Sequence, residues 1–137
     1  MGDQPGVTSS VIFVSRLEVS IEFYCEVFSC QVTIHDRDAA LLLAPNGFQI
    51  YLIARGPNTT HSSGGIGLQY LIWAVGSEAE LRDAAVAIGS RGGRTSSYTS
   101  GGVSFIAFRD PDGIRVLLAH PSPGKLPRSV IGARLYA

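Results

Sequence analysis

The spacing of apolar residues changes period along the first half of the chain. Residues 9–14 form a short apolar run rich in β-branched side chains, which predicts a strand. In residues 18–28 the apolar positions return every three or four residues, which predicts a helix with one buried face. Further strands are predicted over residues 31–35, 39–44 and 48–54.

The second half of the chain repeats this order. Residues 68–75 predict a strand, and Ser77 with Glu80 has the spacing of a capping box at a helix N-terminus. The predicted helix buries Leu81 and Ile88 and stops near Gly89. Three more strands are predicted over residues 95–98, 103–108 and 114–119.

Two turn-and-strand segments confirm this repetition at the level of sequence. Pro45-Asn46-Gly47 and Pro111-Asp112-Gly113 each precede an apolar strand, and they are 66 residues apart (111 − 45). The interval is close to half of the 137 residues, which indicates one βαβββ module written twice. We therefore expect an α+β fold and one domain, 1–137. Its expected parts are module one at about 8–55, a glycine-rich joint at 56–67, module two at about 68–120 and a C-terminal tail at 121–137.

The composition narrows the classes of partner. With 45% hydrophobic residues the chain can build a single core, and eleven basic residues balance eleven acidic ones. This neutrality argues against binding to nucleic acid or to an anionic membrane surface. The sequence shows no leader pattern and no run long enough to span a membrane, so we expect a cytoplasmic protein. Cys25 and Cys30 do not form a CxxC pair and are expected to be small buried apolar groups.

Three features give the chain a family resemblance. Val14-Ser15-Arg16-Leu17-Glu18 leads to Phe23-Tyr24 on the first predicted helix, Arg109-Asp110-Pro111-Asp112-Gly113 forms a hairpin, and the βαβββ order occurs twice. The chain thus resembles the vicinal oxygen chelate superfamily, which includes glyoxalase I, the extradiol dioxygenases and the bleomycin resistance proteins. The resemblance covers most of residues 10–121 and implies two curved half-barrels around a cleft. It also implies a homodimer with two clefts, and we favour the bleomycin-resistance-like, antibiotic-binding branch.

In the metal enzymes of this superfamily, four inward-facing strand positions carry the ligands. The resemblance places these positions here at Ser9, Tyr51, Tyr70 and Leu117, none of which is His, Glu, Asp or Cys. Hydroxyls and a leucine do not supply the imidazole and carboxylate donors that a divalent metal needs, so we expect neither a metal nor another cofactor. Other candidate donors, His35, Asp36, Asp38 and His120, are expected to be surface groups, and His61 in the joint is kept as a minor candidate for ligand contact.

Strand alternation predicts which residues share the inward face with these four positions. The set is mostly apolar and aromatic, with few polar atoms, which is typical of a small-molecule pocket. If Arg115 faces inward it can stack on a flat ligand or bind a carbonyl, whereas a one-residue shift in register would make it an ordinary exposed arginine. The same parity directs Trp73 to the helix side. The expected ligand-binding residues are Ser9, Val11, Phe13, Gln49, Tyr51, His61, Tyr70, Ile72, Arg115 and Leu117.

Three functions fit this sequence. The favoured one is a non-catalytic protein that sequesters a hydrophobic aromatic natural product or antibiotic, as in self-resistance. The alternative is a metal-independent isomerase, cyclase or tailoring enzyme that uses Tyr51, Tyr70 or His61 as an acid or base. A third possibility is an interaction module whose cleft is filled by its own side chains. We expect no catalytic residue and no metal-dependent glyoxalase or dioxygenase activity.

Overall fold

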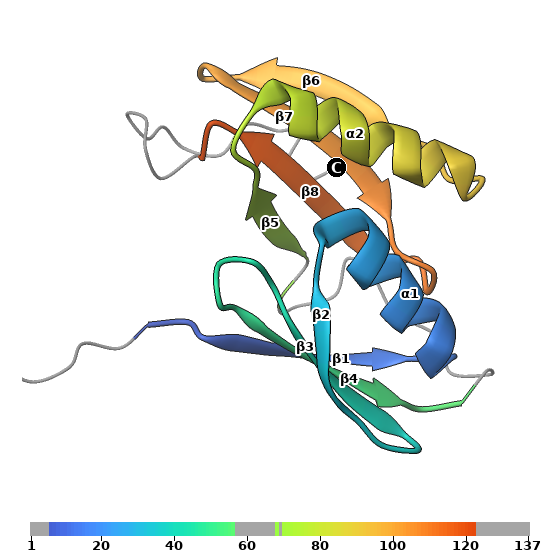
Figure 1. Ribbon diagram of the computed structural model, residues 1–137. Coiled ribbons are helices and arrows are strands. Elements are labelled where there is room, and N and C mark those ends of the chain that lie inside the picture. Colours follow the sequence, from blue (N-terminus) through green and yellow to red (C-terminus); the bar gives the residue numbers. More distant parts are fainter. Residues whose placement is uncertain (1–5, 57–67, 69, 123–137) are drawn as a thin grey trace, which may run out of the picture. The chain divides into compact units, whose positions relative to one another are not determined.

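The chain has an α+β fold with two four-stranded mixed sheets and two helices (Figure 1). The computed structural model describes residues 6–56, 68 and 70–122. The chain divides into two compact units, Met1–His61 and Ser62–Ala137, each with one sheet and one helix. We call these units module one and module two. The predicted joint (56–67, apart from Gly56) and the tail (121–137, apart from its first two residues) lie outside the described residues.

Module one contains β1 (Ser9–Val14), α1 (Leu17–Phe28), β2 (Gln31–His35), β3 (Ala39–Leu43) and β4 (Gln49–Ala54). Its strands are ordered β1-β4-β3-β2. β1 is parallel to β4, and the other neighbours are antiparallel. This is the βαβββ order expected from the alternation of apolar periods, and it brings the first and last strands of the module together at adjacent positions.

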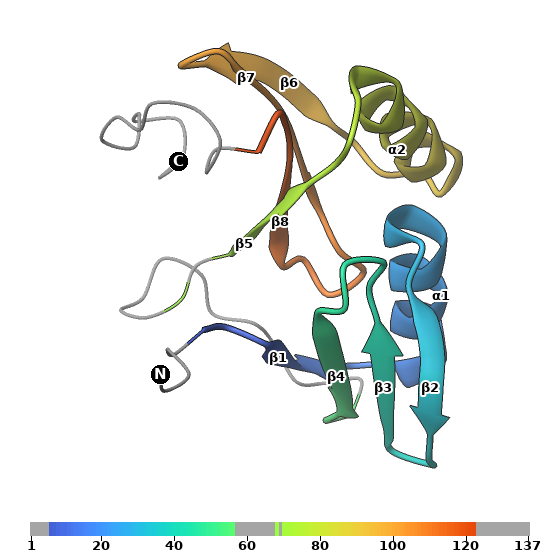
Figure 2. The same ribbon diagram turned by 60° about the vertical axis from the view of Figure 1, so that its left-hand side comes forward.

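Helix α1 covers one face of the module-one sheet and packs against β3 and β4 (Figures 1 and 2). Its buried side includes Tyr24 and Phe28, whose rings stack with centroids 5.5 Å apart. On the strands, alternate residues are almost completely inaccessible, as strand periodicity requires for the helix-covered face. The strand residues with no exposed surface are Leu42, Ile50 and Leu52.

Module two contains β5 (Leu71–Ala74), α2 (Glu78–Ser90), β6 (Ser96–Ser100), β7 (Val103–Arg109) and β8 (Arg115–His120). The strand order β5-β8-β7-β6 is the same as in module one, with a parallel β5-β8 pair and antiparallel neighbours. Helix α2 packs against β7 and β8. The two modules therefore share one topology.

The start of α2 is a capping box. The Ser77 hydroxyl accepts from the Glu80 amide at 3.2 Å, as the sequence predicts. The Glu80 carboxylate accepts from the Gly76 amide at 2.7 Å, one residue before the usual N-cap amide. Both side chains thus bind amides at the helix N-terminus, which the helix itself leaves without acceptors.

The end of α2 corrects the sequence prediction. Gly89 lies inside the helix, which continues to Ser90, and the residue with positive φ is Gly92 at +82°. The Gly93 amide donates to Ile88 O at 2.9 Å and closes the last turn. The helix thus ends at Ser90, and the glycine with the left-handed conformation that follows it is three residues beyond the predicted one. β5 also differs from its prediction, since it begins at Leu71 rather than at residue 68.

The two hairpins that first indicated a repeat have equivalent hydrogen bonds. The Gly47 amide donates to Ala44 O at 2.9 Å, and the Gly113 amide donates to Asp110 O at 2.9 Å. Both glycines have positive φ, +91° and +84°. Each residue of the second turn is 66 positions after its counterpart (113 − 47). Residues related by this offset in the sequence therefore also hold equivalent positions in the two turns.

Among the described residues, neither helix is long and apolar enough to cross a membrane.

Candidate ligand-binding faces

Each sheet has a second face, opposite its helix, which carries the residues predicted to contact a ligand. In module one, the strand register places Val11 beside Tyr51 and Tyr51 beside Leu41. Ile34 of β2 pairs with Leu41 and extends this row. A row on one side contains Ser9, Gln49 and Leu43, and a row on the other side contains Phe13, Ile53 and Ala39. We call these three rows the module-one face.

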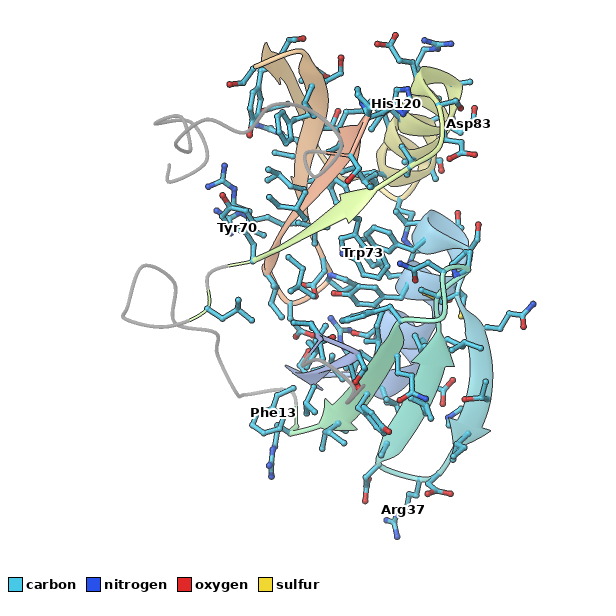
Figure 3. All side chains as sticks on the ribbon, turned by 90° about the vertical axis from the view of Figure 1, so that its left-hand side faces the viewer. Phe13, Arg37, Tyr70, Trp73, Asp83 and His120 are labelled. Atoms are coloured by element: carbon cyan, nitrogen blue, oxygen red, sulfur yellow. The ribbon has the colours of Figure 1, made fainter. Side chains whose placement is uncertain are left out.

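The module-one face exposes large apolar side chains. Val11 is 64% exposed, Ile34 54%, Phe13 53% and Tyr51 36%. Figure 3 shows Phe13 projecting from β1 on the side of the sheet away from α1. Single exposed apolar residues are common on protein surfaces, but a contiguous set on one sheet face is typical of a binding surface.

Polar groups lie at the two ends of this face. The Tyr51 hydroxyl donates to Gln49 Oε1 at 3.4 Å, and the hydroxyls of Thr8 and Ser9 are 3.2 Å apart. At the opposite end, the guanidinium carbon of Arg55 lies 4.1 Å from the centroid of the Phe13 ring. This distance is that of a cation–π contact.

Much of the corresponding face of module two is buried. Leu117 and Ala119 have no exposed surface, Phe105 is 4% exposed, and the Tyr98 ring stacks on Phe105 with centroids 5.3 Å apart. These residues form a hydrophobic cluster with Val103, against which Tyr70, Tyr98 and Ala107 pack. These residues of the second predicted face thus belong to a buried apolar cluster, while Ile72 on the same face is 43% exposed.

The side of the sheet that faces α2 is identified by one hydrogen bond. The Ser104 hydroxyl donates to Glu78 Oε1 of α2 at 3.3 Å, so the neighbouring residues Val103 and Phe105 point to the opposite side. Trp73 pairs with Leu118 and lies on the opposite side of β5 from Tyr70 (Figure 3). Its parity is therefore that of the helix side, as the strand alternation predicts.

Several predicted site residues lie together. Ser9 pairs with Gln49 and Val11 with Tyr51, and the Arg115 guanidinium lies 5.0 Å from the centroid of the Tyr70 ring. In module two, Ile72 pairs with Leu117; Ile72 is 43% exposed and Leu117 is buried. His61 lies outside the described residues. Ligand contact by each of these residues stays a prediction.

The residues at the four metal-ligand positions do not fit a divalent metal. Ser9 and the two tyrosines offer hydroxyls, and Leu117 is buried in the apolar cluster. Across residues 6–56, 68 and 70–122, no three His, Cys, Asp or Glu side chains gather into a possible metal site. The two described histidines bind elsewhere: His35 Nε2 is 2.9 Å from Glu18 Oε1, and His120 Nδ1 is 2.9 Å from Val75 O.

The sequence reasoning missed the residues that β2 and β3 contribute to the module-one face, and it missed Arg55 at the end of β4. Leu41 and Ile34 come from β3 and β2, whose inward residues were not traced, and Arg55 was assigned to the end of the module. A signal was present for Arg55 and for Leu41. Every second residue of a strand points to the same face, and counting from Tyr51 through Ile53 in this way reaches Arg55. The Pro45-Asn46-Gly47 hairpin sets the register that places Leu41 beside Tyr51.

Two βαβββ modules, each with a helix on one sheet face, define the class of protein to which this chain belongs. The sequence profile of the Glyoxalase/Bleomycin resistance protein/Dioxygenase superfamily matches residues 6–118, and the chain belongs to this superfamily. None of the curated proteins matches the chain significantly.

Solved structures share the same fold. A glyoxylase/bleomycin resistance protein/dioxygenase domain from Frankia sp. EAN1pec has a TM-score of 0.75 and 21% identity, over 85% of this chain and 98% of that chain. A lactoylglutathione lyase from Agrobacterium tumefaciens has a TM-score of 0.66 and 12% identity, over 86% and 95%. The oxidase ChaP-H2 also has a TM-score of 0.66, with 16% identity, over 85% and 94%. At these identities the likeness shows the fold alone.

Proposed function

We propose that this protein is a non-catalytic binding protein that sequesters a hydrophobic aromatic natural product or antibiotic, in the manner of the bleomycin-resistance-like branch. The observation that carries the proposal is the exposed apolar row of Val11, Tyr51 and Ile34, with Phe13 beside it. Such a surface binds flat rings by burying their area, and the few polar atoms at its ends fix their orientation.

The chemistry of the residues favours binding over turnover. The positions that hold a metal in the superfamily's enzymes carry hydroxyl and apolar side chains here. Sequestration requires only affinity, which an apolar surface provides without an activated group. As part of the same proposal, the protein acts in the cytoplasm as a homodimer with two clefts.

The test is calorimetric titration with a panel of polycyclic aromatic antibiotics, followed by mass spectrometry of the recovered ligand. Saturable binding with unchanged ligand is the expected result. Phe13→Ala should weaken binding, while Val86→Ala, which removes a 72% exposed apolar side chain from α2, should not. Failure of the whole panel to bind would refute the proposal. Recovery of chemically altered ligand would instead support the alternative, a metal-independent isomerase, cyclase or tailoring enzyme.

A further inference from the structure

We infer that Gln49 selects the ligand of the module-one face, by donating a hydrogen bond from its side-chain nitrogen to a neutral carbonyl oxygen on the edge of a flat aromatic compound. The inference rests on the proposed function and names the group of the ligand that the protein recognises. It is carried by the row of the face on which Gln49 lies, the hydrogen bond that orients its carboxamide, and the neutral surroundings of this end of the sheet.

Gln49 lies in a row that borders the exposed apolar part of the face. The register places Gln49 between Ser9 of β1 and Leu43 of β3. Gln31 of β2 pairs with Leu43 and extends the same row to the edge of the sheet. The next row contains Tyr51, two residues along β4. Strand side chains stand roughly perpendicular to the sheet, so the Gln49 carboxamide meets the edge of a ring system that lies over the row of Tyr51.

The Tyr51 hydroxyl orients the Gln49 carboxamide. It donates to Gln49 Oε1 at 3.4 Å. The backbone amide of Gln49 donates to Thr8 O at 3.1 Å, which fixes this end of β4 beside the start of β1. Within the described residues no hydrogen bond uses the Gln49 Nε2 atom, which has two hydrogens to donate. The carboxamide therefore favours a hydrogen-bond acceptor on the ligand.

This end of the sheet has neutral surroundings. Residues 6–9, 30–32 and 43–49, which form it, contain no charged side chain. The charged residues of the hairpin 35–38 and Arg55 lie at the opposite end of the strands. An ionised ligand group beside Gln49 would lose water without gaining an opposite charge, which costs more than the transfer of a neutral carbonyl. The favoured acceptor is thus a neutral carbonyl oxygen.

The equivalent position of module two is different. Arg115 is 66 residues after Gln49 (115 − 49) and also begins the last strand of its module. Its guanidinium carbon lies 5.0 Å from the centroid of the Tyr70 ring. A charged side chain therefore holds this position in module two, and recognition of a neutral acceptor by a carboxamide belongs to module one.

Three tricyclic compounds that differ at one ring position test this preference. Fluorenone has a carbonyl acceptor at that position, fluorene a methylene group and carbazole an N–H donor. The ratio of fluorenone affinity to fluorene affinity should be about fivefold higher for the wild type than for Gln49→Leu, which keeps the approximate size of the side chain and removes its hydrogen bonds. Titration calorimetry with each compound measures the ratio.

Gln49→Glu changes the chemistry of the side chain and keeps its shape. A carboxylate accepts hydrogen bonds and does not donate them, so this variant should bind carbazole more tightly than fluorenone. Gln31→Glu is the matched control, because it places the same charge on the same row two strands away, or roughly 10 Å. It should change the ratio by less than about twofold, because water screens an exposed charge at that distance.

Tyr51→Phe tests the positioning role of the Tyr51 hydroxyl. The variant keeps the ring, so its affinity for fluorene should be nearly unchanged. Without the hydroxyl, Gln49 Oε1 is able to turn toward the ligand, and carbazole should gain affinity relative to fluorenone. An unchanged order of the three compounds would overturn this role.

Two results would overturn the selection by Gln49. One is a ratio of fluorenone to fluorene affinity that is the same in Gln49→Leu as in the wild type. The other is a reversal of the preference in Gln31→Glu as well, because added charge and not the hydrogen bond would then decide it. Both leave the proposed function intact, since the compounds still bind. Failure of all three compounds to bind to the wild type refutes the inference and counts against the proposed function.

Discussion

Tyr51 and Leu117 are equivalent residues of the two modules, but Tyr51 is exposed and Leu117 belongs to a buried cluster. The neighbouring strands of the two residues also differ. Phe105 lies one row from Leu117, where module one has Ala39, and the Tyr98 ring stacks on Phe105. Duplication of the fold has thus preserved the backbone while the side chains at matched positions have taken different roles.

This difference predicts opposite stability effects for apolar truncations on the two faces. Leu117→Ala should lower the free energy of unfolding by about 2–5 kcal/mol, because it leaves a cavity in a fully buried cluster. Val11→Ala removes a side chain that is 64% exposed and should cost less than about 1 kcal/mol. Urea unfolding of both variants measures the difference. Similar losses would mean that the module-one face is also buried in solution.

The hairpin glycines should respond differently from a helical glycine. Gly113→Ala forces a side chain into φ +84° and should cost about 1–2 kcal/mol. Gly89 lies within α2 with open space around it, so Gly89→Ala should leave stability unchanged or raise it by up to about 1 kcal/mol. Thermal unfolding of the two variants compares them directly. A stable Gly113→Ala protein would show that this turn tolerates another conformation.

The fold could be predicted from the sequence because the spacing of apolar residues and the positions of the turns indicated the same βαβββ repeat. The change from helical to strand period located α1, and the matched turns at Gly47 and Gly113 revealed the repeat. The predicted end of α2 was wrong, because a backbone angle decides where this helix stops. Two glycines, Gly89 and Gly92, follow the last apolar turn of α2, and only the φ of each residue identifies the one that stops the helix.

The two faces were harder to predict than the fold. Alternation assigns Tyr51 and Leu117 to equivalent sides of their sheets, which is correct, but it says nothing about what covers them. Leu117 clusters with Phe105 and Tyr98, which lie on other strands and come together only through the register. A single-strand pattern therefore finds the candidate residues without showing which face is open.

The Asp110 side chain should stabilise the second hairpin. It is 5% exposed, and its Oδ1 accepts from the amides of Asp112 and Ile114, both at 2.9 Å. Asp110→Ala should cost about 2 kcal/mol of unfolding free energy because two amides lose a charged acceptor. The first hairpin has Ala44 at this position and instead uses Asn46, whose exposed Oδ1 accepts from the Phe48 amide at 3.0 Å.

Asn46→Ala is the matched control for Asp110→Ala. The amide that it exposes can bind water, so the loss should stay below about 1 kcal/mol. Chemical denaturation of both variants distinguishes the two turns. Equal losses would show that burial of the Asp110 carboxylate adds nothing to its hydrogen bonds.

We expect the Cys30 thiol to lower the stability of the folded protein at alkaline pH. Burial, with a smaller effect from Cys25, raises the pKa of Cys30 from 9.0 to about 12. Below pH 9 both the folded and the unfolded chain carry the neutral thiol, so this group does not change the stability. Above that pH the unfolded chain loses the proton first, and the free energy of unfolding falls until the pH reaches the folded pKa of about 12.

Cys30→Ala isolates this effect from the titration of other groups. The difference in unfolding free energy between the wild type and the variant should be constant below pH 9 and should shrink as the pH rises above it. Urea unfolding at a series of pH values measures this difference. Parallel curves through the alkaline range would mean that Cys30 ionises as readily in the folded chain as in the unfolded one, which a buried thiol in apolar surroundings does not do.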